Sequence, residues 1–232
     1  KWYRAAAKHG SAKAQERLGA MYRLGRGVPR ENFAEAIAWY TKSADAGNGD
    51  AQLALGEMYR QGQGVEKNNA TARKWFALAA DQGVAAAEAN LWQMFDEGTF
   101  PVDEAFEWNK RMAERGSARS QRTLGNMYAT GKGVSVNSPA AALWYRRAAD
   151  RGDVEAQFNL AMLYKLGTGV TQDFGEAYKW FWLCSTGTPS GPSDLDISGE
   201  AKIELKKLAI LVSPVQISTA KKQAREWKPT KP

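Results

Sequence analysis

Apolar positions along this chain fall into pairs of helix-length segments. In the first clear segment, the residues that share one face at helical spacing are Ala14, Leu18, Gly19 and Tyr22. A glycine-rich turn at 25–28 follows, and the next segment again has one apolar face, made of Ala36, Trp39, Tyr40 and Ala44. Gly47 closes this second segment. The pattern predicts two helices joined by a tight turn, in which the first glycine ends the first helix in the left-handed conformation.

The helix pair recurs along the chain. The leucine of its Leu-Gly pair returns at Leu18, Leu55, Leu91, Leu124 and Leu160, so successive copies are 37, 36, 33 and 36 residues apart. A fixed period in this range indicates a stacked repeat architecture. One helix pair cannot bury its apolar faces alone, so the copies must pack against one another.

The predicted fold class is all-α: a right-handed α-solenoid of stacked antiparallel helix pairs with a C-terminal helical cap. The repeats occupy 1–188, as a partial copy 1–10 and five copies at 11–47, 48–83, 84–116, 117–152 and 153–188. A loop rich in Gly, Pro and Ser follows at 189–198, then capping helices at 199–228 and a tail at 229–232. In the cap, we expect Ala201, Leu205, Leu208 and Leu211 on one buried face, and Ser213-Pro214 at the start of the last helix.

The third copy departs from the pattern. Its turn is Gly98-Thr99-Phe100-Pro101, and Trp92 replaces the glycine of the Leu-Gly pair. An indole cannot occupy the volume of a missing side chain, so we expect an irregular bend there, with Trp92 exposed or bending the stack. The tryptophans that recur at one repeat position are expected to pack in the core; they are Trp2, Trp39, Trp75, Trp108, Trp144 and Trp180.

Four motifs recur in register: the Leu-Gly pair, a Gly-x-Gly-Val turn such as Gly25-Arg26-Gly27-Val28, a Trp-Tyr or Trp-Phe pair, and a closing glycine. This combination resembles the Sel-one-like repeat family, a relative of tetratricopeptide repeats. The resemblance covers Lys1 to about Cys184, and it departs from the family pattern at the third copy, at Ser120 and at Ala161. Tetratricopeptide repeats themselves have a shorter period and lack the Gly-x-Gly-Val turn. The resemblance implies a non-enzymatic scaffold that binds proteins or peptides in a concave groove lined by the first helix of each copy. It also implies a bacterial protein of the periplasm or cell envelope that acts in signalling or regulation.

Composition narrows the chemistry further. The 232 residues include one histidine and one cysteine, His9 and Cys184, too few for a zinc site or a Cys/His dyad. We therefore expect no catalytic residue, no metal and no cofactor. No apolar run is long enough to cross a bilayer. The first residues already read as the end of a helix, so we expect the chain to begin inside a repeat and any targeting sequence to lie upstream.

The expected groove residues lie two before, two after and five after each leucine. The candidates for binding a protein or peptide are Glu16, Arg23, Leu53, Glu57, Arg60, Gln93, Asp96, Arg122, Asn126, Phe158, Met162 and Lys165. Charges along this row would fix the register of a partner, and Leu53, Phe158 and Met162 would supply apolar anchors. We expect that changing Arg23 and Arg60 to Glu abolishes binding and leaves stability unchanged.

Two alternatives remain open. The chain has a net charge of +7, and from Gly199 onward there are eight basic residues against three acidic ones. A patch of Lys206, Lys207, Lys221, Lys222 and Arg225 is therefore a candidate for an anionic polymer, although only Trp227 lies nearby to stack on bases, which disfavours nucleic acid. Alternatively, the chain is a spacer or oligomerisation module that docks through its incomplete N-terminal copy.

Overall fold

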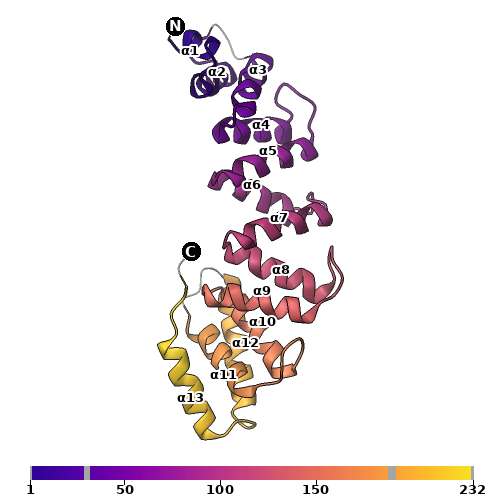
Figure 1. Ribbon diagram of the computed structural model, residues 1–232, viewed down its shortest axis with the longest axis vertical. Helices are drawn as coiled ribbons and strands as arrows, with labels where there is room; N and C mark the ends of the chain where they lie inside the picture. The colour runs from indigo at the N-terminus through magenta and orange to yellow at the C-terminus, as the bar shows by residue number, and fades with distance from the viewer. Residues whose placement is uncertain (1, 29–31, 188–191, 231–232) are drawn as a thin grey trace. The chain divides into compact units, whose positions relative to one another are not determined.

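The computed structural model describes residues 2–28, 32–187 and 192–230, and this part of the chain forms helices and no strand (Figure 1). The all-α fold of stacked helix pairs is confirmed. The helices are α1 (Trp2–Lys8), α2 (Ala12–Leu24), α3 (Phe33–Asp45), α4 (Gly49–Gln61), α5 (Asn69–Asp81), α6 (Ala85–Asp96), α7 (Val102–Glu114), α8 (Ala118–Thr130), α9 (Ser138–Asp150), α10 (Val154–Leu166), α11 (Phe174–Thr186), α12 (Pro192–Leu208) and α13 (Pro214–Glu226).

The chain divides into two compact units, Lys1–Pro101 and Val102–Pro232. The first unit contains α1 to α6 and the second contains α7 to α13. The division falls inside the third copy, between its two helices. Below, the first helix of each copy is called helix A (α2, α4, α6, α8 and α10), and the second is called helix B (α3, α5, α7, α9 and α11).

The two glycines of the repeated turn have different roles. The first ends helix A in the left-handed conformation, for example at Gly62 with φ of 73°, where other residues would be strained. The second glycine, Gly64, lies against the start of the preceding helix B, so that an added Cβ would lie 2.3 Å from the Cβ of Phe33. In the second unit, a Cβ on Gly169 would lie 2.3 Å from the carbonyl oxygen of Ser138. The turn is therefore also a contact between copies.

In the regular copies, an aromatic ring of helix B packs flat against the small residue of helix A. A Cβ added at Gly19 would lie 2.8 Å from the ring of Tyr40, and one added at Gly56 would lie 2.4 Å from the ring of Phe76. Both rings are buried, as is the ring of Tyr145 beside Gly125 in the second unit. The missing side chain lets the two helices approach closely.

The third copy replaces both members of this pair. Trp92 stands in the glycine position, and Asn109 stands in the aromatic position. Trp92 is only 6% exposed, so the alternative in which it is exposed is wrong, and the irregular bend stays a prediction. Its ring packs edge-on against Phe95, with centroids 5.8 Å apart, and its Nε1 donates to Glu88 at 3.4 Å. Asn109 is fully buried and its amide donates to the carbonyl of Ala105 at 2.8 Å.

The recurring tryptophans are less uniformly buried than predicted. Trp108 and Trp180 lie in the core, but Trp39, Trp75 and Trp144 are half-buried, and Trp2 is 89% exposed. The core prediction is wrong for Trp2, because the short helix α1 packs against α2 through Ala7 instead. In the three copies whose tryptophan is half-buried, the residue after it (Tyr40, Phe76 or Tyr145) is buried in the core.

The C-terminal helices begin earlier than predicted. Helix α12 starts at Pro192, so the predicted start at Gly199 is wrong, as is the predicted loop over 192–198; its remaining residues, 189–191, lie outside the described part. Proline is tolerated at a first helical position. Ala201 and Leu208 are buried as expected, but Leu211 is exposed because α12 ends at Leu208, and Val212 is buried instead. Ser213 does cap α13, in a capping box with Gln216. Both α12 and α13 pack against α11.

Candidate functional site

In the first unit, neighbouring A helices are joined by charged and amide side chains. The guanidinium of Arg23 on α2 lies 2.9 Å from the carboxylate of Glu57 on α4, with the side chains 23% and 31% exposed. Arg23 lies five residues after its leucine, and Glu57 lies two after the next one. These two predicted binding positions therefore meet across the boundary between copies.

Arg60 makes the corresponding link from α4 to α6. Its guanidinium donates to Asn90 at 2.8 Å, to Gln93 at 3.0 Å and to Glu97 at 3.1 Å. Beside it is a hollow of about 660 Å³ with polar walls, lined by Arg60, Gln61, Lys67, Asn69, Asn90, Gln93, Glu97 and Thr99. Such a hollow suits polar groups, for example a peptide backbone or a side-chain amide, rather than an apolar anchor. Asp96 lies exposed near the end of α6, and Leu53 on α4 is half-buried.

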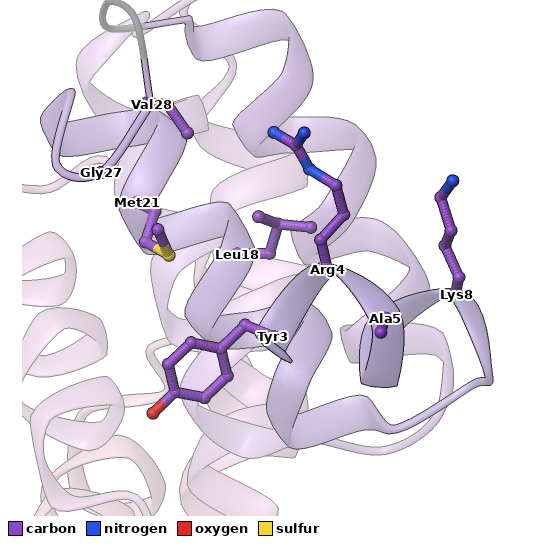
Figure 2. A pocket seen from close by; sticks show the side chains of 8 residues that line it. All are labelled: Tyr3, Arg4, Ala5, Lys8, Leu18, Met21, Gly27 and Val28. Carbon is purple, nitrogen blue, oxygen red and sulfur yellow. The ribbon is translucent and has the colours of Figure 1, made fainter. Parts of the chain in front are cut away.

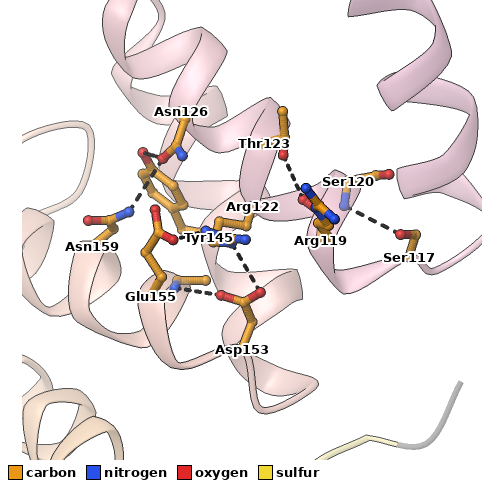
Figure 3. Close-up of polar contacts among 11 residues, drawn as sticks. Ser117, Arg119, Ser120, Arg122, Thr123, Asn126, Tyr145, Asp153, Glu155 and Asn159 are labelled. Atoms are coloured by element: carbon orange, nitrogen blue, oxygen red, sulfur yellow. Dashed lines mark hydrogen bonds and ion pairs between the residues drawn. The ribbon is translucent and has the colours of Figure 1, made fainter. Parts of the chain in front are cut away.

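Arg122 performs the same linking role in the second unit (Figure 3). It forms ion pairs with Asp153, at 3.2 Å, and with Glu155, which both lie at the start of α10. Asp153 also caps α10 by accepting from the backbone N–H of Ala156 at 2.9 Å. Burial raises the pKa of Asp153, and the charge of Arg122 opposes this shift. Arg122 therefore connects α8 to the helix cap of the next copy.

Asn126 lies at a junction of three helices in the same unit. Its Oδ1 accepts from the hydroxyl of Tyr145 on α9 at 2.7 Å and from the amide of Asn159 on α10 at 3.4 Å (Figure 3). Burial raises the pKa of Tyr145 to about 12, so its hydroxyl stays protonated and available as a donor at neutral pH. The position of Asn126 is thereby fixed from two sides.

Four predicted binding residues are less available than expected. Glu16 is only 8% exposed, so its predicted exposure is wrong; it folds back along α2, 3.1 Å from Lys13. Phe158 and Met162 pack against the core that α10 shares with the C-terminal helices, and Phe158 meets Phe181 edge-on at 5.3 Å. Lys165 forms an ion pair with Glu204 of α12. The C-terminal helices therefore occupy the neighbourhood where these last three residues were expected to bind a partner.

These contacts change the expected effect of charge reversal. Arg23 and Arg60 each bridge two copies, so replacing them with Glu would place like charges together between helices. Stability would then fall along with any binding, contrary to the expectation that only binding changes.

The predicted basic patch lies on α12 and α13. Lys206, Lys207, Lys222 and Arg225 are exposed, and Lys221 is half-buried. Hydrogen bonds from Lys165 and Lys207 lower the pKa of Glu204, which lies between those two cations. A hollow of about 610 Å³ on α13 is lined by Pro214, Ile217, Ser218, Lys221, Lys222, Arg225 and Glu226.

A further hollow of about 500 Å³ lies between α1, α2 and the first turn (Figure 2). Leu18 and Met21 supply apolar walls, and Arg4 and Lys8 supply charge. Tyr3 beside them is 52% exposed, although its counterpart Tyr40 is buried. The predicted alternative of oligomerisation would use this surface, and it stays a prediction.

Among the described residues there is no group of three or more His, Cys, Asp or Glu side chains that could hold a metal ion. Cys184 is buried, and burial raises the pKa of its thiol to about 12, which is the opposite of what a nucleophile needs. His9 is exposed at the end of α1. Within the same described ranges, none of the helices has the length and apolar character needed to span a membrane.

Comparison with known proteins identifies the family. The Sel1 repeat model matches residues 1–11, 12–48, 49–84, 118–153 and 154–181. The chain belongs to the Sel1 repeat family. The resemblance inferred from the motifs is confirmed, and the matched stretches omit most of the third copy, where the glycine and aromatic pair is replaced. No curated protein matches the chain.

Two solved structures support the assignment. A Sel1 repeat protein from Oxalobacter formigenes is 30% identical with a TM-score of 0.59, over 95% of this chain and 89% of that one. A protective antigen present in uropathogenic Escherichia coli strains, displaying an SLR fold, is 30% identical with a TM-score of 0.60, over 97% of this chain. This chain spans 47% of the length of the E. coli protein. The Sel1 repeat is commonly a protein-interaction scaffold and is generally non-catalytic.

Proposed function

We propose that this Sel1 repeat chain binds a peptide or protein partner on the A-helix face of its units, with Arg60 and its neighbours as the principal contact. The observation that carries the proposal is the cluster around Arg60, where one guanidinium holds Asn90, Gln93 and Glu97 beside an open polar hollow. The proposal includes a role in the bacterial envelope, supported by the family resemblance and by the bacterial source of the two similar structures.

The geometry favours polar recognition. Arg60, Asn90 and Gln93 are held by one another while part of their surface remains open to solvent. Side chains that are already ordered lose little conformational entropy when a partner binds. Amide and guanidinium groups can pair with the peptide groups of an extended segment, and Asp96 and Lys67 nearby add charge of both signs. This arrangement supports recognition of a peptide with polar character.

The test begins with a random peptide library displayed on phage and selected on the immobilised full chain. A selected peptide is then labelled, and its affinity is measured by fluorescence anisotropy for the wild type and for variants. We expect Arg60→Ala to weaken binding by about tenfold or more, as for a central contact residue. Arg60→Lys, which keeps the charge and loses the planar fork, should give an intermediate loss.

The matched control is Lys74→Ala, which removes an exposed cation from helix B of the same copy. It should change affinity by less than about twofold. Circular dichroism of each variant shows whether the helices are retained. Equal affinity of wild type and Arg60→Ala for every selected peptide, or a larger loss in Lys74→Ala, would rule out the assigned surface.

A further inference from the structure

The corner where α12 ends and α13 begins, residues 209–215, displays three aliphatic side chains to solvent. Ile210 is 86% exposed, Leu211 is 61% exposed and Val215 is 74% exposed. They lie within six residues of one another. The connection between α12 and α13 lies at the end of the second unit opposite α7 (Figure 1). A cluster of large exposed aliphatic residues at one point of a protein surface commonly marks an interaction site.

The backbone holds these side chains outward. Leu208 and Val212, on either side of Ile210 and Leu211, are buried in the core formed with α11. The turn is fixed by hydrogen bonds from the N–H of Leu211 to the carbonyl of Leu208, at 2.8 Å, and from the N–H of Val212 to the same carbonyl, at 3.1 Å. Because both anchors point inward, Ile210 and Leu211 cannot turn in without unfolding the corner.

Cations flank the aliphatic residues on both helices. On α12, Ile203, Lys206 and Lys207 follow the spacing of one helical face, and Ile210 lies in the turn just after this helix ends; all four are exposed. On α13, Val215 and Lys222 are seven residues apart and therefore also share a face, and both are exposed. The nearest acid on α12, Glu204, is already paired with Lys165 and Lys207. The corner thus combines apolar side chains with a surplus of positive charge.

We infer that this corner docks on the surface of an anionic lipid bilayer. Ile210, Leu211 and Val215 would enter the boundary between headgroups and acyl chains, and Lys206 and Lys222 would lie at the level of the headgroups. A nucleic acid or an acidic polysaccharide would use the cations but would leave the aliphatic side chains in water. The pairing of aliphatic and basic residues therefore favours a lipid surface, which satisfies both.

The experiment measures co-sedimentation of the full chain with vesicles of phosphatidylcholine alone or of phosphatidylcholine mixed with phosphatidylglycerol. We expect binding to the anionic vesicles only, and a loss of about tenfold or more when Ile210, Leu211 and Val215 are all changed to Ser. Lys206→Gln with Lys222→Gln should weaken binding by about fivefold for each lysine removed.

Matched controls distinguish vesicle binding by this corner from nonspecific binding by other exposed aliphatic or basic residues. Changing Val136, Leu143 and Leu166 to Ser removes three aliphatic residues of similar exposure, 62%, 51% and 60%, from elsewhere in the second unit. Lys74→Gln with Lys110→Gln removes two exposed lysines from helix B positions. Both controls should bind vesicles like the wild type, and light scattering should show that the serine variants keep the wild-type mass.

Three results would overturn the inference. The first is no sedimentation with phosphatidylglycerol vesicles. The second is undiminished binding by the Ile210, Leu211 and Val215 variant, which would leave only electrostatic attraction. The third is binding to single-stranded DNA or polyglutamate as tight as that to vesicles and indifferent to the serine changes, which would assign the cations to an anionic polymer instead.

Discussion

The packing of aromatic rings on glycine predicts that Gly125→Ala destabilises the second unit although alanine is the better helix former. The added Cβ would lie 2.4 Å from Cδ1 and 2.5 Å from Cε1 of Tyr145. Carbon atoms prefer a separation of about 3.5 to 4.0 Å, so α8 and the ring must move apart by about 1 Å. The hydroxyl of Tyr145 donates to Asn126 at 2.7 Å, which restrains the ring from withdrawing.

Two opposing terms set the magnitude. Replacing Gly by Ala inside a helix stabilises it by about 1 kcal/mol, and overpacking a close-packed core costs about 1 to 3 kcal/mol. We expect a net loss of about 1 kcal/mol in the free energy of unfolding. The fifth copy carries Ala161 in this position, opposite Phe181, a ring without a hydroxyl to restrain it. Alanine therefore occurs in this position in a copy whose facing ring makes no hydroxyl hydrogen bond.

The assay is urea unfolding of the full chain, followed by far-ultraviolet circular dichroism. Gly199→Ala is the control, because it is the same substitution in a helix of the same unit, at a position where an added Cβ meets no atom within 4 Å. That variant should be more stable by about 1 kcal/mol, so the two variants should differ by about 2 kcal/mol. If Gly125→Ala is as stable as Gly199→Ala, the close contact with Tyr145 does not govern packing.

Two further predictions concern titratable groups. Hydrogen bonds from Lys165 and Lys207 lower the pKa of Glu204. The stabilising effect of its carboxylate is therefore present above pH 4.5 and is lost as the pH falls through the lowered pKa. On acidification, the melting temperature of Glu204→Gln should fall less than that of the wild type. Burial raises the pKa of the Cys184 thiol to about 12, so the thiol should resist iodoacetamide in the native protein and react after denaturation. Mass spectrometry measures the labelling, and rapid labelling of the native protein would contradict the burial of Cys184.

The sequence was a sufficient guide to the repeat itself. Leu18, Leu55, Leu124 and Leu160 are all buried, and Gly25, Gly62, Gly131 and Gly167 all end an A helix in the left-handed conformation. These features depend on local spacing and on a backbone conformation that favours one residue type, so a single chain reveals them. The same local information failed at α12, where Gly, Pro and Ser suggested a loop. There, burial of Ala201 and Leu208 against α11 stabilises a helix that includes Gly199.

Contacts between copies could not be predicted, because they depend on the distance between helices rather than on spacing along one helix. Position within the repeat correctly placed Arg23 and Arg60 on the A helices, but gave no sign that each would reach the next copy. Likewise, the tryptophan repeat was conspicuous, yet in three copies the ring after the tryptophan, rather than the indole, is buried in the core. A long polar side chain on a repeat face should therefore be considered first as a contact with the neighbouring copy.

Arg23 and Glu57 join two copies and also belong to the predicted binding face, so binding and stability must be measured separately in the first unit. Arg23→Glu alone places two carboxylates where an ion pair stood at 2.9 Å, and should lower stability by about 1 kcal/mol, since partly exposed pairs are worth about 0.2 to 1 kcal/mol and repulsion adds to the loss. Adding Glu57→Arg restores an ion pair with the charges exchanged. Thermal melting of the double variant should then return toward that of the wild type. A partner that recognises the charges along the A-helix face should still bind the double variant more weakly than the wild type, because the order of charges is inverted. If the double variant melts no higher than Arg23→Glu alone, the ion pair does not join the copies.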